Sequence, residues 1–118
     1  MEGKRKLRVE KIWKWRYITM REVYVVNCCR TAVGSFGGSL KDTPATDLGA
    51  VVVKEVLKRG GVKPEQVDEV MFGCVITAAL GQNPACQVGV KAGIPYSVPA
   101  YTVGMVCGSG MKLSLIHI

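Results

Sequence analysis

The sequence has no long apolar run and very little histidine. No stretch approaches the ~18 apolar residues that a membrane-spanning helix needs. Nothing near the start joins a basic region to an apolar stretch, as a secretory signal does. We therefore expect no membrane partner. His117 is the only histidine and no two cysteines have C-x-x-C spacing, so we expect no metal site.

The cysteines do not form a disulfide pattern. There are five, an odd number at irregular spacing: Cys28, Cys29, Cys74, Cys86 and Cys107. Neighbouring cysteines have poor geometry for one disulfide, so Cys28 and Cys29 are expected to pack at a strand end. Reduced thiols are typical of a cytoplasmic protein.

The net charge of +7 is concentrated in a leader, Met1–Thr19. This leader holds seven basic and two acidic side chains, so the other 99 residues contribute only +2. Such a distribution does not predict a basic face on a fold, and we expect no nucleic-acid partner. The leader also has two acidic residues and no serine, unlike a mitochondrial targeting segment. We expect residues 1–19 to be non-native or disordered, with Met20 as the true start.

Apolar segments alternate with helical patterns along the rest of the chain. The predicted order is strand, helix, strand, helix, strand and then a helix start, which is typical of an α/β layer with a parallel sheet. The strands are expected at Arg21–Asn27, Glu69–Thr77 and Pro99–Val106, the helices at Thr46–Arg59 and from Asn83-Pro84 to Gly93.

The first helix has the clearest local signals. Thr46 is predicted as its N-cap, and Gly60-Gly61 as its end. Its apolar face would contain the large side chains Leu48, Val51, Val52 and Val56.

The last six residues, 113–118, match the translation of a common sequencing adapter. We therefore predict that the native part is 20–112 and that 113–118 is a scar without ordered structure. His117 lies in this segment, so we do not assign it a catalytic role.

Cys107 is the best candidate nucleophile. It follows the third predicted strand and precedes a predicted helix, whose free N–H groups and partial positive charge favour a thiolate. Gly108, Ser109 and Gly110 are small and allow close approach to the backbone. The same N–H groups would suit a developing oxyanion. From position alone, a buried structural cysteine remains an alternative.

Five motifs in 20–112 resemble the thiolase family in order and spacing. They are Arg30–Gly38, Asp68–Gly73, Gly81–Ala85, Lys91–Pro95 and Val106–Lys112. The last of them resembles the family's nucleophile motif, which implies that Cys107 carries the acyl group. The resemblance implies a thiolase-type fold with a mixed or parallel sheet layered with helices, of which this chain has only an incomplete first half-domain.

The resemblance also implies an activity. It is that of an acyl-CoA C-acyltransferase of the acetyl-CoA acetyltransferase type, active in fatty acid metabolism and using coenzyme A thioesters as substrates. A thiolate attacks the thioester, CoA leaves, and the carbanion of a second acetyl-CoA attacks the acyl-cysteine. The activating histidine, the second cysteine and the CoA-binding region lie in the family's later sequence, so we expect this chain to be inactive alone. The full-length protein is expected to be a homodimer or homotetramer that pairs through the strand at 99–106.

Two other functions are candidates. They are a ketoacyl synthase of the same superfamily and a non-enzymatic basic interaction fragment. The loop Gly34–Gly38 lacks the spacing of a P-loop or dinucleotide-binding motif. Gly104 stands where thiolases usually have an asparagine that fixes the nucleophile loop.

Overall fold

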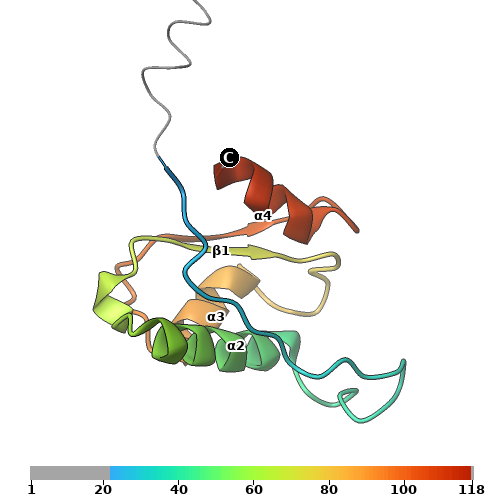
Figure 1. The fold of residues 1–118 in the computed structure, drawn as a ribbon. Helices are drawn as coiled ribbons and strands as arrows, with labels where there is room; N and C mark the ends of the chain where they lie inside the picture. The colour runs from blue at the N-terminus through green and yellow to red at the C-terminus, as the bar shows by residue number, and fades with distance from the viewer. Residues whose placement is uncertain (1–21, 118) are drawn as a thin grey trace, which may run out of the picture.

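The described chain is a small parallel sheet with helices on both faces. In the computed structural model, which describes residues 22–117, strand β1 (Val70–Gly73) pairs with strand β2 (Ala100–Val103). Helix α3 (Pro84–Ala92) connects the two strands and covers one face, while helix α4 (Ser109–His117) lies on the other (Figure 1). The predicted α/β architecture is therefore confirmed, although both strands are shorter than the sequence indicated.

Helix α2 (Ala45–Gly60) packs against α3, and a short 3-10 helix, η1 (Pro64–Gln66), leads from it to β1. The prediction of Thr46 as N-cap is wrong: Pro44 precedes the helix and Thr46 is buried in its first turn. The Thr46 hydroxyl is engaged elsewhere, because Lys91 Nζ donates to its Oγ1 at 2.8 Å. Lys91 also forms an ion pair with Asp47, which links the start of α2 to the end of α3.

The inward face of α2 is only partly the predicted one. Leu48, Val52 and Val56 are half-buried, whereas Val51 is 60% exposed and Ala50 is buried. Small residues allow α2 and α3 to approach closely, and a Cβ at Gly49 would lie only 2.7 Å from Val88 Cγ2. The close contact between α2 and α3 therefore uses the small residues Gly49 and Ala50.

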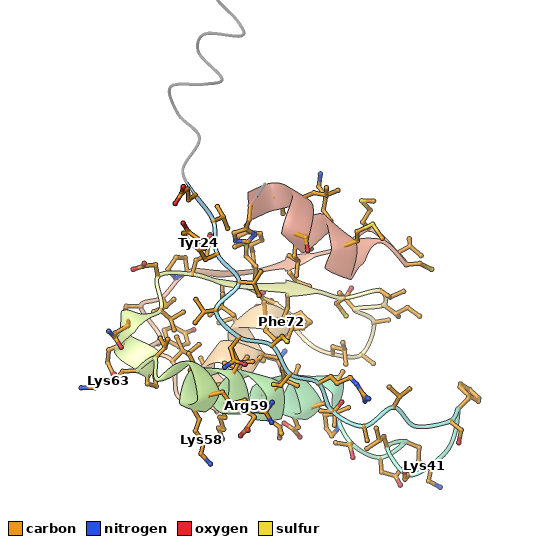
Figure 2. All side chains as sticks on the ribbon, viewed as in Figure 1. Tyr24, Lys41, Lys58, Arg59, Lys63 and Phe72 are labelled. Carbon is orange, nitrogen blue, oxygen red and sulfur yellow. The ribbon has the colours of Figure 1, made fainter. Side chains whose placement is uncertain are left out.

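The last turn of α2 is basic, as predicted, and Lys58 points away from the sheet (Figure 2). Arg59 donates a hydrogen bond of 2.6 Å to Glu55, and this lowers the pKa of the Glu55 carboxyl. The depressed pKa means that the pair stabilises the fold above the ordinary pKa of glutamate and ceases to do so as pH falls. Both side chains are in solvent, so the contribution is small.

The first predicted strand, Arg21–Asn27, is absent from its described part, residues 22–27. Val23, Tyr24, Val25 and Val26 are 57% to 89% exposed. A strand needs a neighbour for its ladder of hydrogen bonds, and neither described strand runs beside this segment. The predicted three-stranded sheet is accordingly two-stranded. Met1–Thr19 and Arg21 lie outside the described residues.

The caps predicted for α3 are confirmed. Asn83 is its N-cap and Pro84 its first residue, while Gly93 ends it with a left-handed φ of 93°. Asn83 also ties the helix to β2, because its Nδ2 donates to the Ala100 carbonyl at 2.8 Å and its Oδ1 accepts from Thr102 Oγ1 at 3.0 Å. Asn83 has a φ of 42°, in the left-handed region.

Helix α4 continues through residues 113–117, contrary to the expectation that this segment has no ordered structure. The end of α4 contributes little to the apolar core, since Leu115 is 57% and Ile116 45% exposed. The buried apolar core lies instead where α2, α3 and the sheet meet, and consists of Ala50, Val70, Ala85, Val88, Ala92 and Ile94.

The start of α4 rests directly on the end of β1. A Cβ at Gly73 would lie 2.7 Å from the backbone N of Gly110 and 2.8 Å from the carbonyl O of Ser109. Real side chains do not approach backbone this closely, so only glycine permits the contact. Gly104, on the neighbouring connection, is different: a Cβ there would meet nothing within 4 Å.

We predict that Gly73→Ala lowers the free energy of unfolding by about 2 kcal/mol, because α4 must shift away from β1. Gly104→Ala is the matched control and should change stability by less than about 0.5 kcal/mol. Urea unfolding followed by circular dichroism measures both. Equal stability of the two variants would contradict the contact described above.

We also predict that Asn83→Ala destabilises the chain by about 2 kcal/mol, since it removes the cap and places alanine in a left-handed conformation. Asn83→Gly loses the same hydrogen bonds but adopts this φ without strain. Glycine should therefore cost about 1 kcal/mol less than alanine in the same unfolding experiment. A larger loss with glycine would show that the backbone conformation at position 83 carries no cost.

Candidate active site

Cys107 lies in the connection between β2 and α4, as the sequence predicted. The strand ends at Val103, so Cys107 is reached through three further residues and not directly from the strand. Gly108 is the last residue before the helix, and its carbonyl accepts the first helical hydrogen bond, from Lys112 N at 2.9 Å. Cys107 is exposed to solvent. A thiol in this place is accessible to a substrate and close to a helix N-terminus.

The chain turns sharply just before the thiol. Gly108 N donates to the Met105 carbonyl at 2.9 Å and closes a four-residue turn around Val106 and Cys107. Val106 has a φ of 47°, a conformation that is rare for a β-branched residue and costs roughly 1–3 kcal/mol. Its side chain is 66% exposed, so packing of that side chain does not explain the strain.

Ser109 is buried beneath this turn, with 1% of its surface exposed. Its Oγ accepts a hydrogen bond from Met105 N at 2.8 Å. The hydroxyl proton faces the Val106 carbonyl at 2.7 Å and the Cys74 carbonyl at 3.3 Å. Ser109 therefore connects the first two residues of the turn to the end of β1. The sequence indicated only a small residue at this position and gave no signal for the hydrogen bonds of its hydroxyl.

The helix N-terminus offers fewer free donors than the sequence suggested. The N–H of Gly108 is bonded to Met105, and that of Ser109 to the Val106 carbonyl at 3.1 Å. Within residues 22–117, no hydrogen bond engages the N–H of Gly110 or Met111. A developing negative charge near this turn would have to use these two groups.

The other cysteines are separate from Cys107 and all are free thiols. Cys29 Sγ donates to the Val52 carbonyl of α2 at 3.3 Å, so it packs against this helix and not at the end of the predicted strand, which is absent from residues 22–27. Cys74 follows β1 and its Sγ donates to the Ile76 carbonyl at 3.2 Å. Cys86 lies on α3 and is half-buried.

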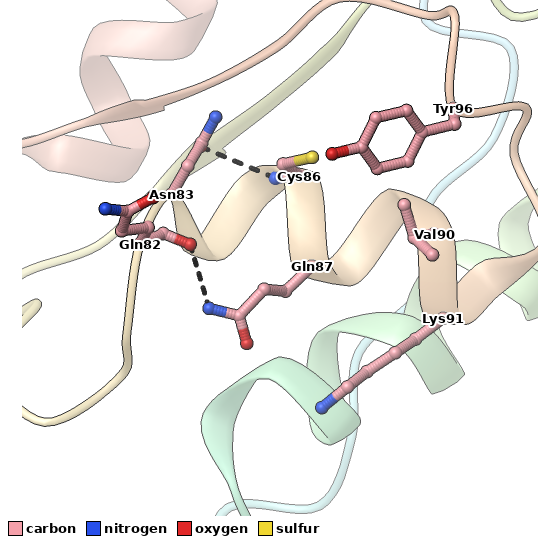
Figure 3. A pocket seen from close by; sticks show the side chains of 7 residues that line it. All are labelled: Gln82, Asn83, Cys86, Gln87, Val90, Lys91 and Tyr96. Carbon is pink, nitrogen blue, oxygen red and sulfur yellow. Dashed lines mark hydrogen bonds between the residues drawn. The ribbon is translucent and has the colours of Figure 1, made fainter.

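A surface cavity of about 390 Å³ lies beside α3 and does not include Cys107. Figure 3 shows its lining residues Gln82, Asn83, Cys86, Gln87, Val90, Lys91 and Tyr96. Several polar groups here already have partners: the Asn83 amide oxygen accepts from Cys86 N, and Gln87 Nε2 donates to the carbonyls of Leu80 and Gln82. These bonds fix the loop before α3, so the cavity by itself indicates no chemistry.

His117 lies far from Cys107. It lies in the last turn of α4, and its Nδ1 is 2.7 Å from the Leu113 carbonyl. Nine helical residues separate the two ends of α4 by about 13 Å. In the part of the chain that the structure describes, no group of three or more metal-binding side chains comes together. None of the helices described there is long and apolar enough to span a bilayer.

Comparisons with known proteins point to one family. The model of the thiolase N-terminal domain matches residues 23–115. An acetyl-CoA acetyltransferase of Cupriavidus necator is 58% identical over 97 residues, which cover 82% of this chain and 25% of that protein. The cytosolic acetyl-CoA acetyltransferase of Rattus norvegicus is 56% identical over 90 residues, covering 76% of this chain and 23% of the relative.

A solved structure agrees with these relatives. The Acat5 thiolase of Ascaris suum, crystallised in complex with coenzyme A, superimposes with a TM-score of 0.79 at 38% identity. The match covers 81% of this chain and 25% of that one. The chain thus spans about a quarter of the length of the relatives that it matches. The matched model covers most of the residues, including the turn at Met105–Gly108, and the chain belongs to the thiolase family.

Proposed function

We propose that the protein is an acetyl-CoA acetyltransferase in which Cys107 is the acyl-accepting nucleophile. The observation that carries the proposal is the position of this thiol: it is exposed on a strained turn before α4, inside the segment that the thiolase model matches. The names of the relatives support a thiolase over a ketoacyl synthase.

The proposed reaction begins with attack of the Cys107 thiolate on the carbonyl carbon of an acyl-CoA. The C–S bond to coenzyme A breaks and CoA leaves as a thiolate, which takes up a proton. The carbanion of a second acetyl-CoA then attacks the acyl-cysteine, forms a C–C bond and releases Cys107. The described residues supply the nucleophile and its turn. The acid–base groups that complete such a reaction belong to the later sequence of the family, so this chain alone is expected to be inactive.

The substrates are accordingly acyl-CoA thioesters, and no separate cofactor is required. The family relationship supports a homodimer or homotetramer as the full-length assembly, with β2 near the subunit interface. The rat relative, which is named as cytosolic, supports a cytoplasmic location and a role in acyl-CoA metabolism. The division into a leader (1–19), a native part (20–112) and a scar (113–118) stays a prediction.

The function is tested with a chimera that joins residues 20–112 to the downstream sequence of the Cupriavidus necator relative. The chimera should cleave acetoacetyl-CoA in the presence of CoA, as measured by the loss of absorbance of its magnesium enolate. Cys107→Ala should lower kcat by about 10³-fold or more, because removal of a nucleophile removes nearly all of the covalent chemistry.

Cys86→Ala is the matched control, a half-buried cysteine on α3 outside the turn that holds Cys107. It should retain activity within about threefold, because it removes a thiol that the proposed reaction does not use. A folded chimera that keeps its activity after Cys107→Ala would disprove the assignment.

A further inference from the structure

We propose that Ser109 is a positioning residue: its hydroxyl holds the strained turn at Val106 and thereby places the Cys107 thiol at the N-terminus of α4. The inference rests on the proposed role of Cys107 as nucleophile. It concerns how this chain presents the thiol, whichever acyl group the thiol accepts.

The hydrogen bonds of Ser109 differ from those of an ordinary helix cap. An N-cap side chain accepts from N–H groups two or three residues later in the helix. Ser109 is instead the first residue of α4, and its Oγ accepts from Met105 N, four residues earlier. The same oxygen lies 2.7 Å from the Val106 carbonyl. The hydroxyl therefore bonds to Met105 and Val106, the two residues that precede Cys107. It caps no N–H group of the helix, whose first hydrogen bond is accepted by the Gly108 carbonyl.

Strain at Val106 explains why such a connection is needed. A valine at φ 47° relaxes to a negative φ unless its neighbours prevent this. The exposed Val106 side chain makes no packing that would do so, whereas the Ser109 hydroxyl contacts the backbone on both sides of the strained residue. Two backbone bonds, from Gly108 N to the Met105 carbonyl and from Ser109 N to the Val106 carbonyl, also close the turn. Without the hydroxyl, these two bonds alone would oppose the strain at Val106, and the turn would loosen and move Cys107 away from the helix N-terminus.

Burial makes this arrangement robust. Ser109 is 1% exposed, so water cannot substitute for its hydrogen bonds. The third contact, 3.3 Å to the Cys74 carbonyl, fixes the hydroxyl to the end of β1, at the strand whose Gly73 admits the start of α4. The Ser109 Oγ thus links the segment after β1, at Cys74, to the segment after β2, at Met105 and Val106, and the position of Cys107 depends on this link.

The test is alkylation of the 118-residue chain with iodoacetamide, quantified for each cysteine by mass spectrometry. Cys28 is exposed and distant in sequence, so the ratio of the Cys107 rate to the Cys28 rate reports on the turn and not on the reagent. We expect Ser109→Ala to lower this ratio by about threefold or more, the scale of the helix N-terminus effect on a charged group. Ser114→Ala, an exposed serine on the same helix, is the matched control and should leave the ratio unchanged.

A second variant separates positioning from simple stabilisation. Glycine adopts a positive φ without strain, so Val106→Gly should keep the turn even without the hydroxyl. We expect the double variant Ser109→Ala/Val106→Gly to recover most of the lost ratio, although it carries one more substitution. A merely structural Ser109 would give no such rescue, because Val106→Gly restores no buried hydrogen bond.

An unchanged ratio in folded Ser109→Ala, or a low ratio in the folded double variant, would overturn the proposal. If Ser109→Ala unfolds the chain, as reported by circular dichroism and by faster alkylation of Cys86, the double variant decides: a folded chain with the parent ratio supports the proposal, and any other result counts against it. The assay uses no acyl-CoA, so a failure of the proposed enzymatic function, seen only in the chimera, is distinguishable from a failure here.

Discussion

The contact between the end of β1 and the start of α4 determines where the Cys107 thiol lies. At Gly73 the backbones of the two elements approach more closely than any side chain would allow. The Ser109 hydroxyl, buried at the same junction, contacts the carbonyl of Cys74 and the backbone of Met105 and Val106. Cys107 itself is exposed. Its position is fixed by the backbone around it, which Gly73 and Ser109 hold in place.

The rest of the described fold keeps that junction in place. The sheet consists of only two short strands, and α3 is anchored to β2 through Asn83, whose side chain bonds to Ala100 and Thr102. Helix α2 then packs on α3 through small residues, among them Ala50 and Gly49. Helix α2 thus supports α3, α3 supports the sheet, and the sheet supports the turn that holds Cys107.

Large apolar side chains remain outside this core. Val25, Ile76 and Met111 are each at least 70% exposed, and the buried set contains no aromatic residue. A core made largely of alanine and valine stabilises a fold only weakly. The chain spans about a quarter of the length of the relatives that it matches.

Local chemistry made several features predictable. Asn83-Pro84 and Gly93 mark the ends of α3 because capping and left-handed termination depend on single residues. The alternation of strands and helices predicted the β1–α3–β2 unit, and the motif around Cys107 predicted a helix start, although the strand was expected up to Val106 and the turn between them was missed. The strand at Arg21–Asn27 was predicted wrongly because an apolar run indicates burial, whereas a strand also requires a neighbour to pair with.

The sequence by itself determined the family, the α/β order and the position of Cys107 between a strand and a helix, because these follow from patterns along the chain. Only the tertiary structure decided which face of α2 is buried, that Gly73 must be glycine, and that Val106 is held at a positive φ by Ser109. These features arise from contacts between residues far apart in sequence or from strain that no local preference would select. Valine is among the residues least suited to that conformation, so its place in the turn follows from the surrounding hydrogen bonds and not from its own propensity.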